Sequence, residues 1–153
     1  RTGGAMRHLV GSPEGSIVYG SEMALDTIVA TDTATDEVTN LAVVDRLPNT
    51  IDVSPDGRLL FVSNRGRNNP ETYYRPGPEW GTVVVLDTAT GAYLDAIVGG
   101  NQTTGLDVSP DGTLLAFSDF LDDRIVIYRI PDYDDLLAGG GGRWGDHTVE
   151  KVK

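Results

Sequence analysis

The residues of this sequence best suited to molecular recognition gather in one stretch, 64–80. It contains three arginines, two tyrosines and a tryptophan: Arg65, Arg67, Tyr73, Tyr74, Arg75 and Trp80. The guanidinium fork of arginine binds carboxylate or phosphate, and aromatic faces stack on rings, sugars or a partner's side chains. Because the chain carries a net charge of −11, so many cations in one stretch indicate a binding site. The same aromatic residues could instead pin a long proline-containing loop onto its neighbours, and the sequence leaves both interpretations open.

A second group of polar residues could hold a metal ion. Asp119, Asp122 and Asp123 lie close together in the sequence, and carboxylates are ligands that Ca²⁺ prefers. Their spacing matches no EF-hand loop, and turns in which aspartate accepts backbone hydrogen bonds explain the cluster equally. The chain has no cysteine, which excludes thiolate metal sites and cysteine-linked haem. The sequence therefore predicts no cofactor and no metal, with these aspartates as weak candidates.

The sequence carries no motif of a catalytic centre. It lacks the Gly-x-Ser-x-Gly elbow, the His-Glu-x-x-His pair and a glycine loop that would cradle phosphates. Twenty-three acidic residues stand against twelve basic ones, a balance that works against binding a nucleic-acid backbone. No apolar run is long enough to span a membrane. These observations favour a globular chain without catalytic residues.

An internal repeat determines where these candidates must lie. The stretch 53–63, which begins Val-Ser-Pro-Asp-Gly, returns at 108–118, and a weaker copy occupies 11–20. The copies are spaced by 42 residues (Ser12 to Ser54) and by 55 (Ser54 to Ser109). The middle repeat therefore carries an insertion of 13 residues, which falls within 64–80. A period of about 42 residues is typical of propeller or solenoid arrays.

Each repeat divides into four short strands joined by tight turns. Ser-Pro-Asp-Gly closes the first pair, since proline fixes φ and glycine accepts the positive φ that follows. The third strand is nearly continuous in β-branched and aliphatic residues, as at 82–86, which is typical of a strand covered on both faces. A second turn, Asp-Thr-Ala-Thr at 32–35 and 87–90, should be held by its aspartate. Four strands per repeat indicate a β-propeller blade.

These motifs carry a resemblance to a known family. The sequences Ser-Pro-Asp-Gly-x-Leu-Leu-Phe-Val-Ser-Asn and Val-Val-Val-Leu-Asp-Thr-Ala-Thr-Gly resemble the YVTN-type β-propeller repeats of bacterial and archaeal secreted proteins. The resemblance covers about residues 6–131. It implies an all-β fold and an extracellular or periplasmic location. Related propellers include lactonase-like enzymes, haem-d nitrite reductases, amine dehydrogenase subunits and surface-layer proteins, so the resemblance leaves the function open.

The repeat predicts a domain that is an incomplete ring. We expect a partial β-propeller over 1–131, with four-stranded antiparallel blades at about 6–43, 48–98 and 103–131, and a C-terminal tail over 132–153. The third blade lacks a recognisable fourth strand of its own, and a helical turn capped by Asp132 is expected at the start of the tail. Three blades leave apolar flanks exposed. We expect the remaining blades of a longer chain, in all seven, to complete the ring; self-association or a partner chain is the alternative.

Propeller geometry then sorts the loops between two faces. By resemblance, the face around the channel mouth carries ligands, and the insertion falls on it. His8, Asn101 and Gln102 are expected on the same face and join the insertion as candidate binding residues; a lone histidine such as His8 is often structural. The sequence favours a non-catalytic scaffold that binds a protein or small-molecule ligand. A lactonase-like hydrolase, or a propeller subunit of a redox enzyme, is the alternative.

Overall fold

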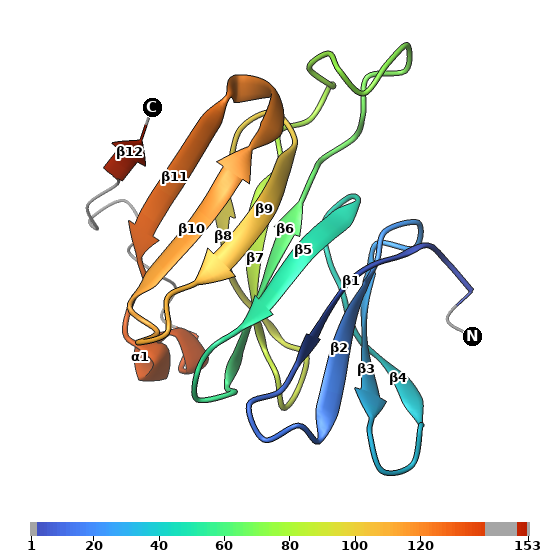
Figure 1. Ribbon diagram of the computed structural model, residues 1–153, viewed down its shortest axis with the longest axis vertical. Coiled ribbons are helices and arrows are strands. Elements are labelled where there is room, and N and C mark those ends of the chain that lie inside the picture. The colour runs from blue at the N-terminus through green and yellow to red at the C-terminus, as the bar shows by residue number, and fades with distance from the viewer. Residues whose placement is uncertain (1–2, 140–149, 153) are drawn as a thin grey trace.

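The computed structural model describes residues 3–139 and 150–152, and it is an all-β structure of three four-stranded antiparallel sheets (Figure 1). The first sheet contains β1 (Met6–Gly11), β2 (Ile17–Glu22), β3 (Thr27–Asp32) and β4 (Val38–Val43). The second contains β5 (Pro48–Val53), β6 (Leu59–Asn64), β7 (Thr82–Asp87) and β8 (Tyr93–Val98). The third contains β9 (Thr103–Val108), β10 (Leu114–Asp119), β11 (Arg124–Arg129) and β12 (Glu150–Val152).

The three sheets are blades of a β-propeller, as the repeat predicts. Their innermost strands β1, β5 and β9 lie next to one another, and the sheets fan outwards from them (Figure 1). The second blade is packed between the other two, so β6 is buried along its whole length. Alternate residues of β6 point to opposite faces: Leu60 and Val62 pack against the first blade, whereas Leu59 and Phe61 pack against the third. This double burial explains the continuous apolar strands.

The repeated turns are stabilised by their own side chains. In the second blade the Ser54 hydroxyl accepts the N–H of Leu59 at 2.9 Å and donates to the Asp56 carboxylate at 2.7 Å. Gly57, with a φ of 78°, donates its N–H to the Ser54 carbonyl; a residue with a side chain would be strained there. In the second motif Asp32 accepts the N–H groups of Ala34 and Thr35. Both motifs are therefore structural turns, at the end of the blades away from the insertion.

Hydrogen bonds between blades recur at equivalent positions of the repeat. Ser21 of β2 donates to the Asn49 carbonyl of β5 at 2.6 Å. Forty-two residues later, Ser63 of β6 donates to the Thr104 carbonyl of β9, also at 2.6 Å. Asp52 of β5 accepts the N–H of Val108 in β9 at 2.8 Å. The first and second blades thus each place a hydroxyl on a carbonyl of the blade that follows.

The third sheet corrects one part of the sequence-based prediction. The sequence predicts a third blade without a recognisable fourth strand of its own, but Glu150–Val152 pairs antiparallel with Ile125–Ile127 of β11. This strand is three residues long, follows no turn motif and comes from the segment predicted as a tail. The unpaired outer edge of β11 offers its backbone groups to any strand of suitable length, which explains why a strand without a sequence signature can pair there.

The start of the predicted tail folds as the capping pattern indicates. Helix α1 (Tyr133–Leu137) begins after Asp132, whose side chain accepts the N–H groups of Asp134 and Asp135. Leu136 is fully buried and joins the core between the second and third blades. Residues 140–149 of the predicted tail lie outside the described residues. Within the part of the chain that the structure describes, no helix is both long enough and apolar enough to cross a membrane.

Candidate functional site

One end of the blades carries the connections β2–β3, β6–β7 and β10–β11; we call it the loop face. The connection 65–81, which contains the insertion, extends from this end (Figure 1). The innermost strands β1, β5 and β9 begin here: β5 and β9 each follow a connection on this face, and Met6 at the start of β1 pairs with Glu22 at the end of β2. Side chains at the starts of these strands therefore gather at one place, which we call the mouth, because a closed propeller has the end of its channel there.

Gln102 ties the insertion to the mouth. It lies just before β9, is buried, and has a φ of 60°. Its side-chain nitrogen donates to the Tyr73 carbonyl at 2.5 Å, and its side-chain oxygen accepts a hydrogen bond from Nη2 of Arg65. The Arg65 guanidinium also lies 6.0 Å from the centre of the Tyr73 ring, within reach of a cation–π interaction. The structure thus brings together Arg65, Tyr73 and Gln102, three of the residues that the sequence selects.

Beside this group the insertion forms an aromatic surface with the third blade. The rings of Tyr73 and Tyr74 lie 4.0 Å apart, and their hydroxyls are joined at 2.5 Å. This hydrogen bond raises the pKa of Tyr73. Tyr74 in turn faces Phe120, with ring centres 6.5 Å apart. All three side chains are exposed, Tyr74 most of all at 64%. Exposed aromatic rings held in fixed positions can stack on a ligand.

A second arginine, which the sequence did not select, lies at the mouth. Arg7 of β1 donates from Nε to the Asn49 side chain of β5 at 3.0 Å. The backbone N–H of Arg65 donates to the Leu47 carbonyl at 3.1 Å, so Arg7 and Arg65 are both held at the start of β5. Burial lowers the pKa of Arg65, and the positive charge of Arg7 lowers it further. Arg7 and Asn49 occupy equivalent positions of the repeat, 42 residues apart. An alignment of the innermost strands of the three repeat copies could have revealed Arg7 and Asn49 as a pair.

The other candidates of the insertion are held elsewhere. Arg67 forms an ion pair with Glu79 at 3.2 Å, and Arg75 forms one with Glu71 at 2.7 Å. Both pairs lie within the insertion and stabilise its own conformation. Trp80, 66% exposed, lines pockets on the flanks of the second blade. The insertion thus uses Arg67 and Arg75 internally and presents Arg65 to the mouth.

His8 and Asn101 make structural hydrogen bonds. Nδ1 of His8 accepts the N–H of Ile51 at 3.3 Å, which links the first blade to the second. Asn101 donates to Asp122 from its backbone at 2.7 Å and from its side chain at 2.8 Å. Ordinary loop and blade contacts therefore occupy these two candidates.

Hydrogen-bond donors surround the aspartates considered as metal ligands. Asp119 is fully buried and forms an ion pair with Arg124, while Gly100 N–H and the Thr103 hydroxyl each donate to it at 2.7 Å. Hydrogen bonds from the Asn101 side chain and backbone lower the pKa of Asp122. Asp123 has a left-handed φ of 47° after the short helix η1 (Phe120–Asp122). Among residues 3–139, no three His, Asp or Glu side chains are placed to hold a metal ion.

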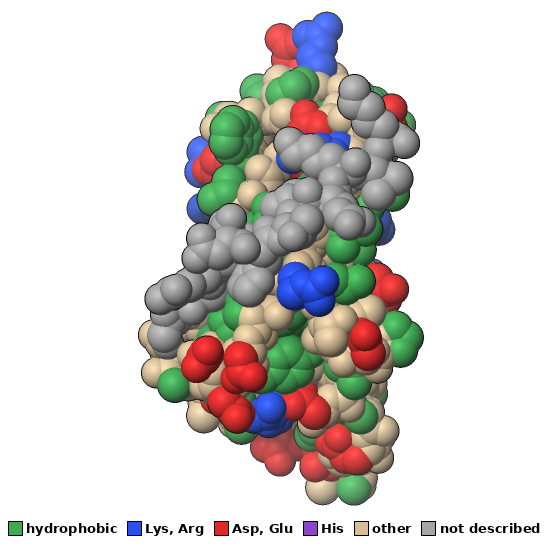
Figure 2. Space-filling model, turned by 90° about the vertical axis from the view of Figure 1, so that its left-hand side faces the viewer, with side chains coloured by type: hydrophobic (Ala, Val, Ile, Leu, Met, Phe, Trp, Pro, Cys, Tyr) green, Lys and Arg blue, Asp and Glu red, His purple; other side chains and the backbone are tan. Residues whose placement is uncertain are grey.

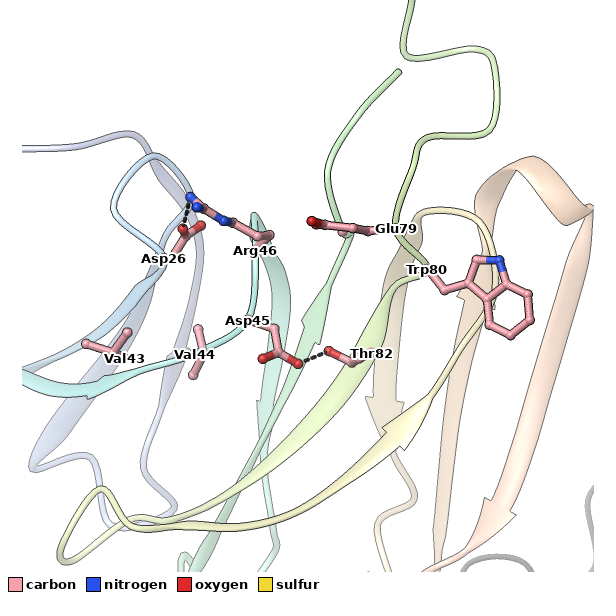
Figure 3. A pocket seen from close by; sticks show the side chains of 9 residues that line it. Asp26, Val43, Val44, Asp45, Arg46, Glu79, Trp80 and Thr82 are labelled. Atoms are coloured by element: carbon pink, nitrogen blue, oxygen red, sulfur yellow. Dashed lines mark hydrogen bonds and ion pairs between the residues drawn. The ribbon is translucent and has the colours of Figure 1, made fainter. Parts of the chain in front are cut away.

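A pocket of about 370 Å³ lies between the first and second blades on the outer side of the loop face (Figure 3). Arg46 forms an ion pair with Asp26 at 2.9 Å, and the Thr82 hydroxyl donates to Asp45 at 2.6 Å. In Figure 3 the Trp80 ring points away from Asp45 and Thr82. The acidic groups in this pocket are largely paired, so fewer of its polar groups are free to bind a ligand than at the mouth.

Comparisons with known proteins agree with this architecture. No family model matches the chain. Residues of the chain are 43% identical over 127 positions to Antigen Lp49 of Leptospira interrogans serogroup Icterohaemorrhagiae serovar copenhageni (strain Fiocruz L1-130). The match covers 82% of the chain but 28% of that relative. The chain therefore spans less than a third of the length of this curated relative.

Similar solved structures show the fold. Hydrazine synthase of Kuenenia stuttgartiensis has a TM-score of 0.68 at 24% identity, covering 81% of the chain and 32% of the other. A Bacteroides fragilis protein proposed to be a 6-phosphogluconolactonase has a TM-score of 0.71 at 19% identity, and the match covers 99% of the chain and 40% of that protein. The β-propeller domain of Cps50 (Swd1) from Myceliophteria thermophila has a TM-score of 0.70 at 15% identity, and the match covers 99% of the chain and 40% of that domain. At these identities the likeness establishes a β-propeller fold and carries no function.

Proposed function

We propose that this chain is part of a β-propeller that serves as a non-catalytic binding module, with its ligand held at the mouth. The observation that carries the proposal is the group formed by Arg65, Tyr73 and Gln102, in which the inserted loop is fastened to the entry of the third blade. A loop that needed only to be packed would bury its aromatic rings. Tyr73 and Tyr74 instead remain exposed beside a cation, as in a recognition surface.

The chemistry of the mouth favours binding over catalysis. Within the described residues the mouth presents arginines, amides and tyrosines, while the imidazole of His8 and the carboxylate of Asp119 are engaged in hydrogen bonds. A general base needs a free acceptor within reach of the substrate proton. The alternative of a lactonase-like hydrolase or a redox subunit therefore has less support.

A screen of small metabolites by thermal shift would test the proposal. Compounds that raise the unfolding temperature of the chain should lose this effect in Tyr73→Ser/Tyr74→Ser, because stacking is lost. The matched control Tyr93→Ser removes an exposed tyrosine of β8 and should keep the effect. Saturable lactone hydrolysis that the mouth variants abolish, or a bound chromophore in the visible spectrum, would instead support an enzyme.

The partners that complete the ring are proposed to be further blades. On the outer face of the third blade Ser118 occupies the position of Ser21 and Ser63, and Asp107 the position of Asp52. Among the described residues Ser118 donates to no carbonyl of another blade, and Asp107 is exposed. Ile125 beside them is 48% exposed. The hydroxyl, the carboxylate and the apolar surface match those that join the second blade to the third.

The outer face of the first blade also has side chains that lack packing and hydrogen-bond partners. Leu9 is 58% exposed there, and the Glu22 carboxylate is fully buried without a hydrogen-bond partner on either oxygen. At the equivalent position of the third blade, Asp119 receives an N–H from Gly100, which follows the last strand of the preceding blade. A preceding blade would supply the donor that Glu22 lacks. The chain matches only 28% of its curated relative, which leaves room for such blades in a longer polypeptide.

The surface charge and the relative suggest the setting of this module. On the side that Figure 2 shows, acidic side chains gather towards the end of the molecule that carries α1. With a net charge of −11, this surface disfavours nucleic acid as a ligand. The likeness to a protein named as an antigen supports a surface or secreted location. Antibody labelling of intact cells against permeabilised cells would check it, and labelling only after permeabilisation would contradict it.

A further inference from the structure

Arg65 differs from most of the described arginines in its electrostatic partners. Five arginines form ion pairs with carboxylates: Arg46, Arg58, Arg67, Arg75 and Arg124. Arg65 forms no ion pair with a described carboxylate, although this residue is half-buried and the chain is strongly acidic. A partly desolvated cation without a counter-ion is costly, so this exception calls for a ligand.

The donors of Arg65 are incompletely used. Its guanidinium donates to Gln102 through Nη2, while its Nε is buried and has no acceptor. A buried donor left without an acceptor destabilises a protein. The side chain is nevertheless held in place by Gln102 and the Tyr73 ring. The guanidinium is thus fixed in position and short of acceptors.

Arg7 adds a second positive charge at the mouth. Its Nε is fixed by Asn49, and no described carboxylate pairs with it. Arg65 is anchored close by, because its backbone N–H donates to the Leu47 carbonyl at 3.1 Å, two residues before Asn49. Two guanidinium groups that repel each other become favourable neighbours when an anion lies between them, and each can offer two parallel N–H groups to its oxygens.

We propose that Arg7 and Arg65 together bind an oxyanion, phosphate or carboxylate, carried by the ligand of the mouth. The proposal rests on the binding function proposed above and names the chemistry of the ligand. The anion would be held between β1 and the start of the insertion, while Tyr73 and Tyr74 would contact the remainder of the molecule. An anionic ligand with a flat or ring-shaped body fits this arrangement.

Titration of the chain with simple anions tests the site. Sodium phosphate and sodium acetate are each followed by thermal shift and calorimetry against sodium chloride at matched ionic strength. At least one oxyanion should bind saturably beyond chloride, and Arg65→Gln and Arg7→Gln should each weaken it at least tenfold. The control Arg129→Gln removes an exposed arginine at the far end of β11 and should leave binding unchanged. Preference for phosphate over acetate, or the reverse, identifies the group that the site accepts.

The outcomes separate this proposal from the broader one. Absence of binding beyond chloride, or equal binding in Arg65→Gln, Arg7→Gln and the unaltered chain, would overturn the oxyanion site. Metabolites that still depend on Tyr73 and Tyr74 would then leave the mouth as a binding site for neutral ligands. Because Arg7 is exposed, its variant should fold even if Arg65→Gln does not.

Discussion

The hydroxyl of Ser63 lies 2.6 Å from the carbonyl oxygen of Thr104 and joins the second blade to the third. The same hydroxyl also accepts the N–H of Thr50 at 3.0 Å, so it satisfies the innermost strands of two blades at once. Ser118, at the equivalent position of the third blade, accepts the N–H of Gly105, and among the described residues no blade follows it. Comparing Ser63 with Ser118 therefore measures how much the contact between blades contributes to stability.

Ser63→Ala should destabilise the chain markedly, and Ser118→Ala should not. Ser63 is fully buried, and its removal leaves backbone groups without partners, at a cost of about 1–3 kcal/mol in the free energy of unfolding. Ser118→Ala should cost less than about 0.5 kcal/mol, as is usual for partly exposed positions. Denaturant unfolding of both variants measures the difference. Equal losses would show that the inter-blade carbonyl contributes nothing.

Glu22→Met should stabilise the isolated chain. The Glu22 carboxyl group is fully buried and reaches no donor, and replacing a buried polar group without partners by an apolar group of similar size is favourable by about 1–3 kcal/mol. Asp119→Asn is the matched variant at the equivalent position. Asp119→Asn breaks the ion pair with Arg124 and should lower the free energy of unfolding by about as much as Glu22→Met raises it. A Glu22→Met variant less stable than the unaltered chain would mean that this carboxylate has a partner in solution.

The fold could be predicted from the sequence because the repeat is long and its turns are specific. Ser54 and Ser109 mark the same turn in two blades, and the distance between them exposes the inserted loop. The strand β12 could not be predicted, because it pairs through backbone groups of β11 and needs no side-chain pattern. Local sequence therefore determined the blades, whereas the closing strand depends on an edge made elsewhere in the chain.

The mouth could be predicted only in part, for a related reason. The composition of the insertion singled out Arg65 and Tyr73, but the same criterion also selected Arg67 and Arg75, which pair inside the loop with Glu79 and Glu71. Which arginine faces the channel depends on ion pairs that spacing alone does not reveal. Arg7 lies in a strand of ordinary composition, and its contact with Asn49 depends on the approach of β1 to β5.

Asp52→Asn should change how stability depends on pH. Burial raises the pKa of Asp52, against hydrogen bonds from Val108 and Val53 that lower it, and the charge of Asp107 adds to the rise. A carboxyl with a raised folded pKa contributes stability below its unfolded pKa and loses it as pH rises through the folded pKa. Asp52→Asn removes that loss. Its stability relative to the unaltered chain should therefore increase from acid to neutral pH, measured by denaturant unfolding at several pH values.

Asp111→Asn provides the control of opposite sign. A hydrogen bond from the Ser109 hydroxyl lowers the pKa of Asp111. The stability contributed by this carboxylate is present above its unfolded pKa and is lost as pH falls through the folded pKa. The variant should therefore fall behind the unaltered chain as pH rises. Parallel pH profiles for Asp52→Asn and Asp111→Asn would contradict both assignments.

Gly66→Ala should impair oxyanion binding at the mouth without unfolding the blades. Gly66 has a φ of 72°, and a Cβ built on it would lie 2.7 Å from the Trp80 carbonyl oxygen, where the two ends of the insertion come together. The strain must be relieved by moving the loop, and Arg65 is the adjacent residue. Phosphate or acetate affinity should fall by tenfold or more, measured as for the arginine variants. The blades pack through cores that do not include the insertion, so the unfolding temperature should fall by only a few degrees, as for a cost of about 1 kcal/mol. Unchanged affinity in a folded Gly66→Ala chain would mean that the loop conformation does not set the position of Arg65.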